Sequence, residues 1–242
     1  MNQSAALATA IGVARPEPRT GAERAAAWIA GDVLSSVLHI SDAPMAYVMA
    51  AQGHDVVVAD PDIRVVRNPD IFYVRTEGDR PPFAAASFDV VVAPHIHESP
   101  VALAEFARVL RPDGLLSTMT RTYDDSIPWM RKLRATVGHR PMPTMSTDAL
   151  TASGLFAEPE VEEFGTWEEL DLNGALRFAT QVKDPSIGDE VLPAVRDLFT
   201  EYASQSGTLR LRHQTHCLRA RVIRDAFVDE VPPPETTLMD LR

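Results

Sequence analysis

The sequence predicts an α/β fold, in which a mostly parallel sheet carries helices on both of its faces. Short apolar strands alternate with helical segments along the first half of the chain, which is the pattern of parallel strands joined by right-handed crossovers. Residues 54–59 and 88–93 each contain three consecutive valines, typical of strands that are covered on both faces. The last predicted strand, residues 208–222, is long, arginine-rich and partly alternating, which fits an edge or antiparallel strand.

Composition limits the classes of function. The 242 residues suffice for one domain with a full core. The net charge of −11 disfavours nucleic acid and anionic membranes as partners, because their phosphates would be repelled. No stretch approaches the ~20 apolar residues of a membrane span, and the amino-terminal residues lack the pattern of a signal peptide. Cys217 is the only cysteine, so no internal disulfide can form. These features predict a cytoplasmic protein.

The individual elements follow from capping signals and apolar runs. Residues 20–34 are predicted to be helical, because Thr20 and Glu23 have the spacing of a capping box. Pro44 suits a first helical turn and Gly53 a helix end, which predicts a second helix between them. Strands are predicted at residues 37–40, 54–59, 72–74, 88–93, 115–120, 161–164 and 208–222, with a turn at 111–114. Further helices are predicted at residues 101–110, 128–137, 171–182 and 189–203, and within 142–154 from near Ser146 or Thr147.

Residues 21–226 are predicted to form one domain, between a flexible lead-in over residues 1–20 and a loosely held tail over residues 227–242. Residues 165–205 are predicted to form a helical cap or insertion before the last strand. Its apolar side chains could cover the carboxyl edge of the sheet or form a dimer face, and the sequence favours neither alternative. They are Leu176, Phe178, Leu198, Phe199 and Tyr202.

Two stretches of sequence carry a resemblance to a known family. FDVVVA followed by EFARVLRPDGLL, and DDSIPWMRKL over residues 124–133, resemble class I S-adenosylmethionine-dependent methyltransferases, in particular the small-molecule branch labelled type 11. The resemblance implies a Rossmann-like, seven-stranded sheet in the order 3-2-1-4-5-7-6 with an antiparallel seventh strand. It also implies S-adenosyl-L-methionine as cofactor and methyl transfer to a small-molecule acceptor.

The cofactor loop departs from the pattern of that family, which is an acid on the first strand followed by Gly-X-Gly-X-Gly. His39 stands at the position of the acid, and Ser41, Ala43 and Met45 stand at those of the glycines. Glycine permits a positive φ and a close approach of backbone to ligand, and the Met45 side chain could occupy the volume of the cofactor. Asp42 would oppose the cofactor's carboxylate at the start of the following helix.

Other residues match the cofactor-binding positions that the resemblance implies. Asp60 ends the second predicted strand, where an acid can accept hydrogen bonds from ribose hydroxyls, although it could equally be a turn acid before Pro61. Asp79 would face the adenine amine, and Ala93 ends the fourth strand beside the cofactor.

The acceptor side is predicted at the carboxyl ends of strands four and five. His95 or His97 could line the pocket and act as a general base with Glu98 beside it, or all three could belong to an exposed polar loop. No metal site is predicted. Tyr123 and Trp129 could shape an acceptor pocket on the same rim, whereas Trp129 could also be a packing anchor.

Two functions are therefore open. One is an active methyltransferase with an altered cofactor loop and a small-molecule substrate. The other is a catalytically inactive pseudo-methyltransferase that binds a partner protein, as a homodimer or in a heteromer with an active methyltransferase. The family resemblance favours the first, and the side chains in the loop favour the second.

Overall fold

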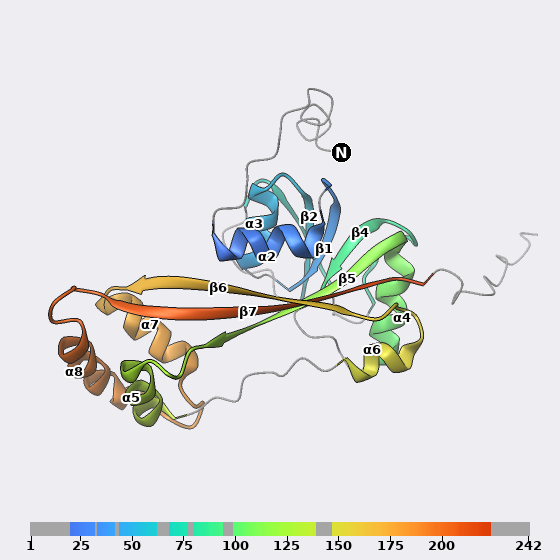
Figure 1. Ribbon diagram of the computed structural model, residues 1–242. Coiled ribbons are helices and arrows are strands. Elements are labelled where there is room, and N and C mark those ends of the chain that lie inside the picture. The colour runs from blue at the N-terminus through green and yellow to red at the C-terminus, as the bar shows by residue number, and fades with distance from the viewer. Residues whose placement is uncertain are drawn as a thin grey trace, which may run out of the picture.

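The computed structural model describes residues 20–31, 33–41, 44–61, 68–76, 80–93, 99–138 and 147–223. The described strands form one seven-stranded sheet in the order β3-β2-β1-β4-β5-β7-β6 (Figure 1). Neighbouring strands are parallel from β3 to β5, whereas β7 runs antiparallel to both β5 and β6. The predicted α/β fold with an antiparallel last strand is confirmed, as is the strand order that the family resemblance implies.

The strands are β1 (Ser36–Ile40), β2 (Asp55–Asp60), β3 (Ile71–Arg75), β4 (Phe88–Val92), β5 (Leu110–Tyr123), β6 (Glu160–Leu170) and β7 (Leu209–Arg221). The helices are α2 (Gly21–Ala30), α3 (Pro44–Ala51), α4 (Pro100–Val109), α5 (Pro128–Val137), α6 (Asp148–Ser153), α7 (Leu172–Val182), the short 3₁₀ helix η1 (Asp189–Val191) and α8 (Leu192–Tyr202). Within the described ranges, no helix has the length and apolar character needed to cross a membrane.

Local signals in the sequence explain where the first helices begin and end. Thr20 and Glu23 form the predicted capping box, with the Thr20 hydroxyl accepting the Glu23 N–H at 3.1 Å and the Glu23 carboxylate accepting the Thr20 N–H at 2.9 Å. α2 ends at Ala30, earlier than predicted, because Gly31 adopts a φ of +79° and turns the chain out of the helix. α3 begins at Pro44 as predicted.

The parallel part of the sheet is packed on both faces, which accounts for its valine runs. α2 and α3 cover one face, where Ile29 and Met49 lie fully buried against alternate strand residues. α4 and α6 cover the other, where Phe106 and Leu150 are fully buried. Successive strand residues point to opposite faces, so a strand between two helical layers needs apolar side chains at nearly every position.

β5, β7 and β6 continue well beyond the parallel part of the sheet. The last pair of β4 with β5 is Val92–Ser117, whereas β5 and β7 remain paired as far as Tyr123–His213. On this extension α5, α7 and α8 pack together around the side chains of Leu209 and Leu211 (Figure 1). We call these three helices, with the strand ends on which they pack, the helical lobe.

Three details differ from the sequence predictions. Residues 111–114, predicted as a turn, lie within β5, where the pairing with β4 shifts from Phe88–Leu110 to Val90–Leu115. Asp113 adopts a φ of +63° inside this bulge, so the chain does turn there without leaving the strand. β6 is much longer than residues 161–164, and β7 is an interior strand rather than an edge.

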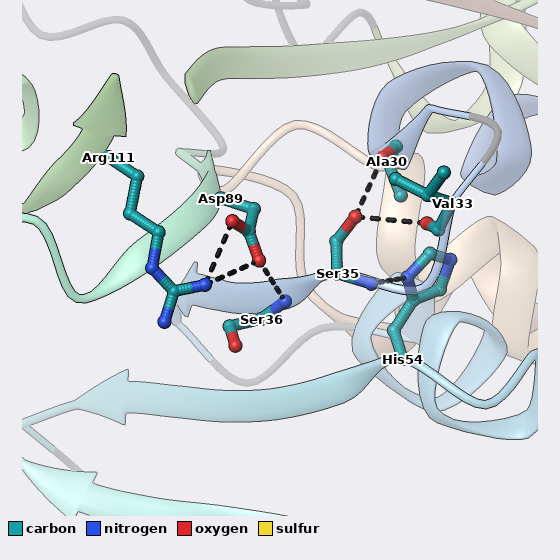
Figure 2. Close-up of polar contacts among 7 residues, drawn as sticks. All are labelled: Ala30, Val33, Ser35, Ser36, His54, Asp89 and Arg111. Carbon is teal, nitrogen blue, oxygen red and sulfur yellow. Dashed lines mark hydrogen bonds and ion pairs between the residues drawn. The ribbon is translucent and has the colours of Figure 1, made fainter. Parts of the chain in front are cut away.

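Side chains from neighbouring elements hold the amino end of β1 (Figure 2). The Asp89 carboxylate accepts the Ser36 N–H at 2.8 Å and receives the Arg111 guanidinium at 2.9 Å. The Ser35 N–H donates to Nδ1 of His54 at 3.2 Å, so that nitrogen is the unprotonated one. These contacts fix where β1 starts, and therefore where its carboxyl end meets the following loop.

We expect Gly114→Ala to destabilise the protein. A Cβ at this position would lie 2.9 Å from the Arg111 carbonyl oxygen and 3.1 Å from that of Asp89, so backbone would have to shift. Overpacking of this kind costs about 1–3 kcal/mol in the free energy of unfolding, measurable by urea denaturation. Gly165→Ala is the matched control, because a Cβ at that position would meet no atom within 4 Å. Equal stability of the two variants would contradict the expectation.

Candidate functional site

The carboxyl end of β1 turns sharply at Ser41. Ser41 has a φ of +78°, the left-handed region that favours glycine, although it carries a Cβ. Its N–H donates to the Ala59 carbonyl at 2.8 Å, which continues the β1–β2 pairing by one residue. The first of the three glycine positions therefore retains a glycine-like backbone without the glycine, at a cost of roughly 1–2 kcal/mol.

His39 supports this turn from the strand. It is 1% exposed and lies between Val58 of β2 and Val92 of β4. Its Nδ1 lies 2.8 Å from the Ser41 carbonyl oxygen, and because a carbonyl only accepts, Nδ1 carries the proton. A carboxylate at this position could not donate to that oxygen, so the exchange of acid for imidazole is coupled to the path of the loop.

Met45 does not occupy the loop in the way that its size led us to expect. It is 4% exposed and belongs to the apolar cluster between α2, α3 and the sheet, together with Ile29 and Val37. The long side chain is thus part of the core beneath α3. The expectation that it fills the volume of a cofactor is not met.

Asp60 and Ala93 lie at the same edge of the sheet as Ser41. Asp60 ends β2 and is half-buried, and its carbonyl accepts the Thr76 N–H at 3.3 Å. Ala93 follows β4, is fully buried, and donates its N–H to the Ser117 carbonyl at 2.9 Å. Because β1, β2 and β4 are adjacent parallel strands, their carboxyl ends bring His39, Ser41, Asp60 and Ala93 to one edge.

Several predicted site residues lie outside the described residues, and their roles stay predictions. They are Asp42, Ala43, Asp79, His95, His97 and Glu98. In the described part of the chain, no group of three or more His, Cys, Asp or Glu side chains could hold a metal ion.

Tyr123 and Trp129 lie in the helical lobe rather than at the edge formed by β1, β2 and β4. Tyr123 is six residues beyond Ser117, the last β5 residue paired with β4, a distance of about 20 Å along an extended strand. Trp129 is 5% exposed, and its Nε1–H donates to the Arg210 carbonyl at 3.1 Å. Trp129 is therefore a packing anchor, the alternative that the sequence left open.

Tyr123 is better placed to meet a ligand, because it is only half-buried. Its ring packs edge-on against Phe178 and against His213, with centroid distances of 4.8 Å and 5.3 Å. Burial raises the pKa of the Tyr123 hydroxyl, which keeps that hydroxyl protonated.

A histidine–carboxylate pair beside Tyr123 was missed by the sequence interpretation. Nε2 of His213 lies 2.6 Å from the Glu168 carboxylate, and His213 is 5% exposed. The two residues are 45 positions apart in sequence and meet only through the β6–β7 register. The single cysteine is different, since burial raises the pKa of the Cys217 thiol to about 12 and makes it unreactive.

Comparisons with known proteins relate this fold, and part of the sequence, to methyltransferases. A model of the methyltransferase domain matches residues 24–118, and no curated protein sequence matches the chain. A proposed type II methyltransferase from Anaeromyxobacter dehalogenans is 18% identical with a TM-score of 0.60, over 86% of this chain and 98% of that one. The YcgJ protein from Bacillus subtilis is 12% identical with a TM-score of 0.50, over 83% of this chain and 98% of that one. The chain has the fold of class I methyltransferases.

The residues that match the methyltransferase-domain model include the strand ends of the candidate site. The family model spans β1 to β5, up to Ser117 and Thr118, which is the parallel part of the sheet with α3, α4 and most of α2. The helical lobe and the whole of β6 and β7 lie beyond the matched residues.

We expect Ser41→Gly to stabilise the protein by up to about 1.5 kcal/mol. Relief of the left-handed strain, roughly 1–2 kcal/mol, exceeds the extra unfolded-state entropy of glycine, about 0.5–1 kcal/mol. Ser41→Ala is the matched control, because it removes the hydroxyl but keeps the Cβ, and it should give no gain. Thermal or urea unfolding measures both variants, and a gain as large in the alanine variant would rule out backbone strain as the cause.

Proposed function

We propose that the protein binds S-adenosyl-L-methionine at the carboxyl ends of β1 and β2 and transfers a methyl group to a small molecule. The observation that carries the proposal is the left-handed backbone of Ser41 at the first glycine position of the family pattern. A strained conformation persists only where its surroundings impose it, and such strain clusters at ligand sites. Here the chain keeps the turn of the cofactor loop even though serine opposes it.

The residues around this turn fit an adenosyl ligand. Asp60 ends the neighbouring strand, where a carboxylate accepts hydrogen bonds from both ribose hydroxyls. Met45 lies in the core rather than in the loop, so its side chain leaves the turn clear. Asp79 and Ala93 complete the proposed set, as partners of the adenine and its surroundings. S-adenosylmethionine, when bound, supplies a methyl group made electrophilic by the sulfonium.

We place the acceptor beyond the carboxyl end of β4. His95 or His97 would act as the general base and Glu98 would orient it or the acceptor, since all three follow the strand end at Ala93. The helical lobe would close this side of the site as a cap. A small-molecule acceptor suits the acidic chain, because a net charge of −11 repels nucleic acid. We retain a cytoplasmic location as part of the same proposal.

A second candidate function is that of an inactive relative that binds a partner protein. The observation that favours it is His39, whose Nδ1–H is engaged by the Ser41 carbonyl where the family has an acid. A neutral imidazole in that tautomer presents one lone pair on Nε2 but lacks the negative charge with which a carboxylate would pair with the cofactor's ammonium group. In this case the loop path would be a remnant that no longer binds the cofactor.

Calorimetric titration with S-adenosylmethionine and S-adenosylhomocysteine tests the proposal. We expect saturable binding tighter than millimolar, and a loss of about tenfold or more in Asp60→Asn, because hydrogen bonds to a charged group contribute about 1.5–3 kcal/mol. Asp55→Asn is the matched control, since Asp55 begins the same strand at its opposite end.

Absence of binding by either ligand would overturn the proposed function and favour the inactive relative. If Asp60→Asn and Asp55→Asn weaken cofactor binding equally, the proposal that the protein binds the cofactor still holds. The role of Asp60 as a direct contact would then be wrong. A binding constant that Asp55→Asn leaves unchanged would show that general electrostatics of β2 do not account for the loss.

A further inference from the structure

One face of the β5–β7–β6 extension carries a group of polar side chains between α2 and the helical lobe. Tyr123 is paired directly with His213, and Arg121 with Thr215, in the antiparallel register of β5 and β7. Residues that are directly opposite or two apart share a face of the sheet. Arg121, Tyr123 and His213 therefore lie on one face, together with Glu168, which contacts His213 from β6.

The protonation of His213 follows from its partners. Nε2 lies 2.6 Å from the Glu168 carboxylate, which can only accept, so Nε2 carries the proton. Burial lowers the pKa of His213, and the nearby Arg121 guanidinium lowers it further, against the opposing effect of Glu168. At neutral pH the ring is thus neutral, and its Nδ1 is a hydrogen-bond acceptor.

Nδ1 of His213 is buried and has no hydrogen-bond partner in the described chain. The residue as a whole is 5% exposed. A buried acceptor without a donor is costly, on the order of 1–3 kcal/mol, and in native proteins it commonly marks a place for water or a ligand. The missing group has to be a donor, such as a hydroxyl or an N–H.

Arg121 supplies a second, independent sign of a ligand. Its side chain is exposed, and it makes no hydrogen bond or ion pair with any described residue. Two arginines of the neighbouring strand β7, by contrast, have partners: Arg212 lies 3.6 Å from Asp124, and Arg219 lies 2.7 Å from Glu160. A guanidinium is shaped to bind a carboxylate through two parallel hydrogen bonds. Arg121 is exposed and Tyr123 is half-buried, so the β5 side of this group is in contact with solvent.

We propose that Arg121, Tyr123 and His213 form a binding site for a hydroxy-carboxylic acid. The Arg121 guanidinium binds the carboxylate, and Nδ1 of His213 accepts the hydroxyl proton in a hydrogen bond. The Tyr123 hydroxyl, which donates to no described residue, is a further donor to the carboxylate. Glu168 is a positioning residue, because it acts through the Nε2–H of His213 and fixes the tautomer.

This site can hold the far end of a methyl acceptor that extends past the end of β4, an assignment that rests on the proposed function. Arg121 lies four residues beyond Ser117, where β4 ends, which is about 13 Å along the strand. The amino end of α2 closes the other side. A Cβ at Gly21 would lie 1.7 Å from the Thr166 hydroxyl, and Thr166 is paired with His213.

Titration with 4-hydroxybenzoate tests this site. The methyl ester of 4-hydroxybenzoate is the control ligand, because it keeps the hydroxyl but lacks the negative charge of the carboxylate. Binding is followed by calorimetry and by the side-chain nitrogen resonances of His213 in NMR spectra. We expect saturable binding of the acid with a shift of the His213 Nδ1 resonance, and binding about tenfold or more weaker for the ester. Arg121→Gln should weaken binding of the acid to the level of the ester, because the charge-assisted hydrogen bonds are lost.

Arg196→Gln is the matched control, since Arg196 is an exposed arginine on α8. His213→Gln removes the ring acceptor and should weaken binding of the acid and the ester alike. The inference is overturned if the acid does not bind, if Arg196→Gln weakens binding as much as Arg121→Gln, or if the His213 resonances do not move. Glu168→Gln should change the tautomer signature of His213, which a role in packing alone would not do.

S-adenosylhomocysteine, titrated into the same samples, separates this inference from the proposed function. Binding of 4-hydroxybenzoate without binding of S-adenosylhomocysteine would support the hydroxy-acid site. It would contradict the assignment of the bound acid as a methyl acceptor. Binding of S-adenosylhomocysteine without binding of 4-hydroxybenzoate would support the cofactor site and contradict the hydroxy-acid site.

Discussion

The pairing of β1 with both of its neighbours is the constraint on which the candidate cofactor site depends. β1 is in register with β2 and β4 at Val37, Leu38 and His39, and the Asp89 carboxylate holds its amino end. The Ser41 N–H adds one further bond to β2, after which the chain must turn at once into α3. The left-handed backbone of Ser41 is thus a consequence of the sheet and not a local preference of serine. His39 donates to the Ser41 carbonyl and so stabilises the same turn from below.

The length of β5, β7 and β6 determines where the second candidate site, the one for a hydroxy acid, can form. Because these strands continue past the end of β4, the antiparallel part of the sheet has one face that α2 covers only in part. The helical lobe covers the far end of that face around Leu209 and Leu211. Arg121, Tyr123 and His213 lie between α2 and the helical lobe on this face. A parallel sheet alone would have offered a cofactor edge but no such additional face.

The parallel part of the fold could be predicted from the sequence, because each signal there is local. The valine runs, the Thr20–Glu23 capping box and Pro44 each require only a few neighbouring residues. β6 was predicted too short, because it is an edge strand whose exposed glutamates hide the apolar pattern. β5 was predicted to end at residue 120, and for that reason Tyr123 and Trp129 were assigned to the rim of the parallel strands.

The candidate site could be predicted only in part, because its geometry depends on contacts between distant residues. The strand ends predicted the edge at which Ser41 and Asp60 lie, whereas no local pattern predicts a positive φ for serine. The same is true of His213 and Glu168, which meet through the register of two strands joined by two helices. Met45 shows the converse, since its size alone indicated an obstructed loop and its packing places it in the core.

Hydrogen–deuterium exchange of the intact protein, with and without S-adenosylhomocysteine, tests the central claim most directly. We expect slower exchange confined to peptides that contain the ends of β1 and β2, residues 39–41 and 59–61, because ligand binding there stabilises the Ser41 turn against local opening. Peptides from α8, at the far end of the helical lobe, should exchange at an unchanged rate. Unchanged exchange at the β1 and β2 ends, with protection elsewhere or nowhere, would contradict the claim that this turn is a retained cofactor loop.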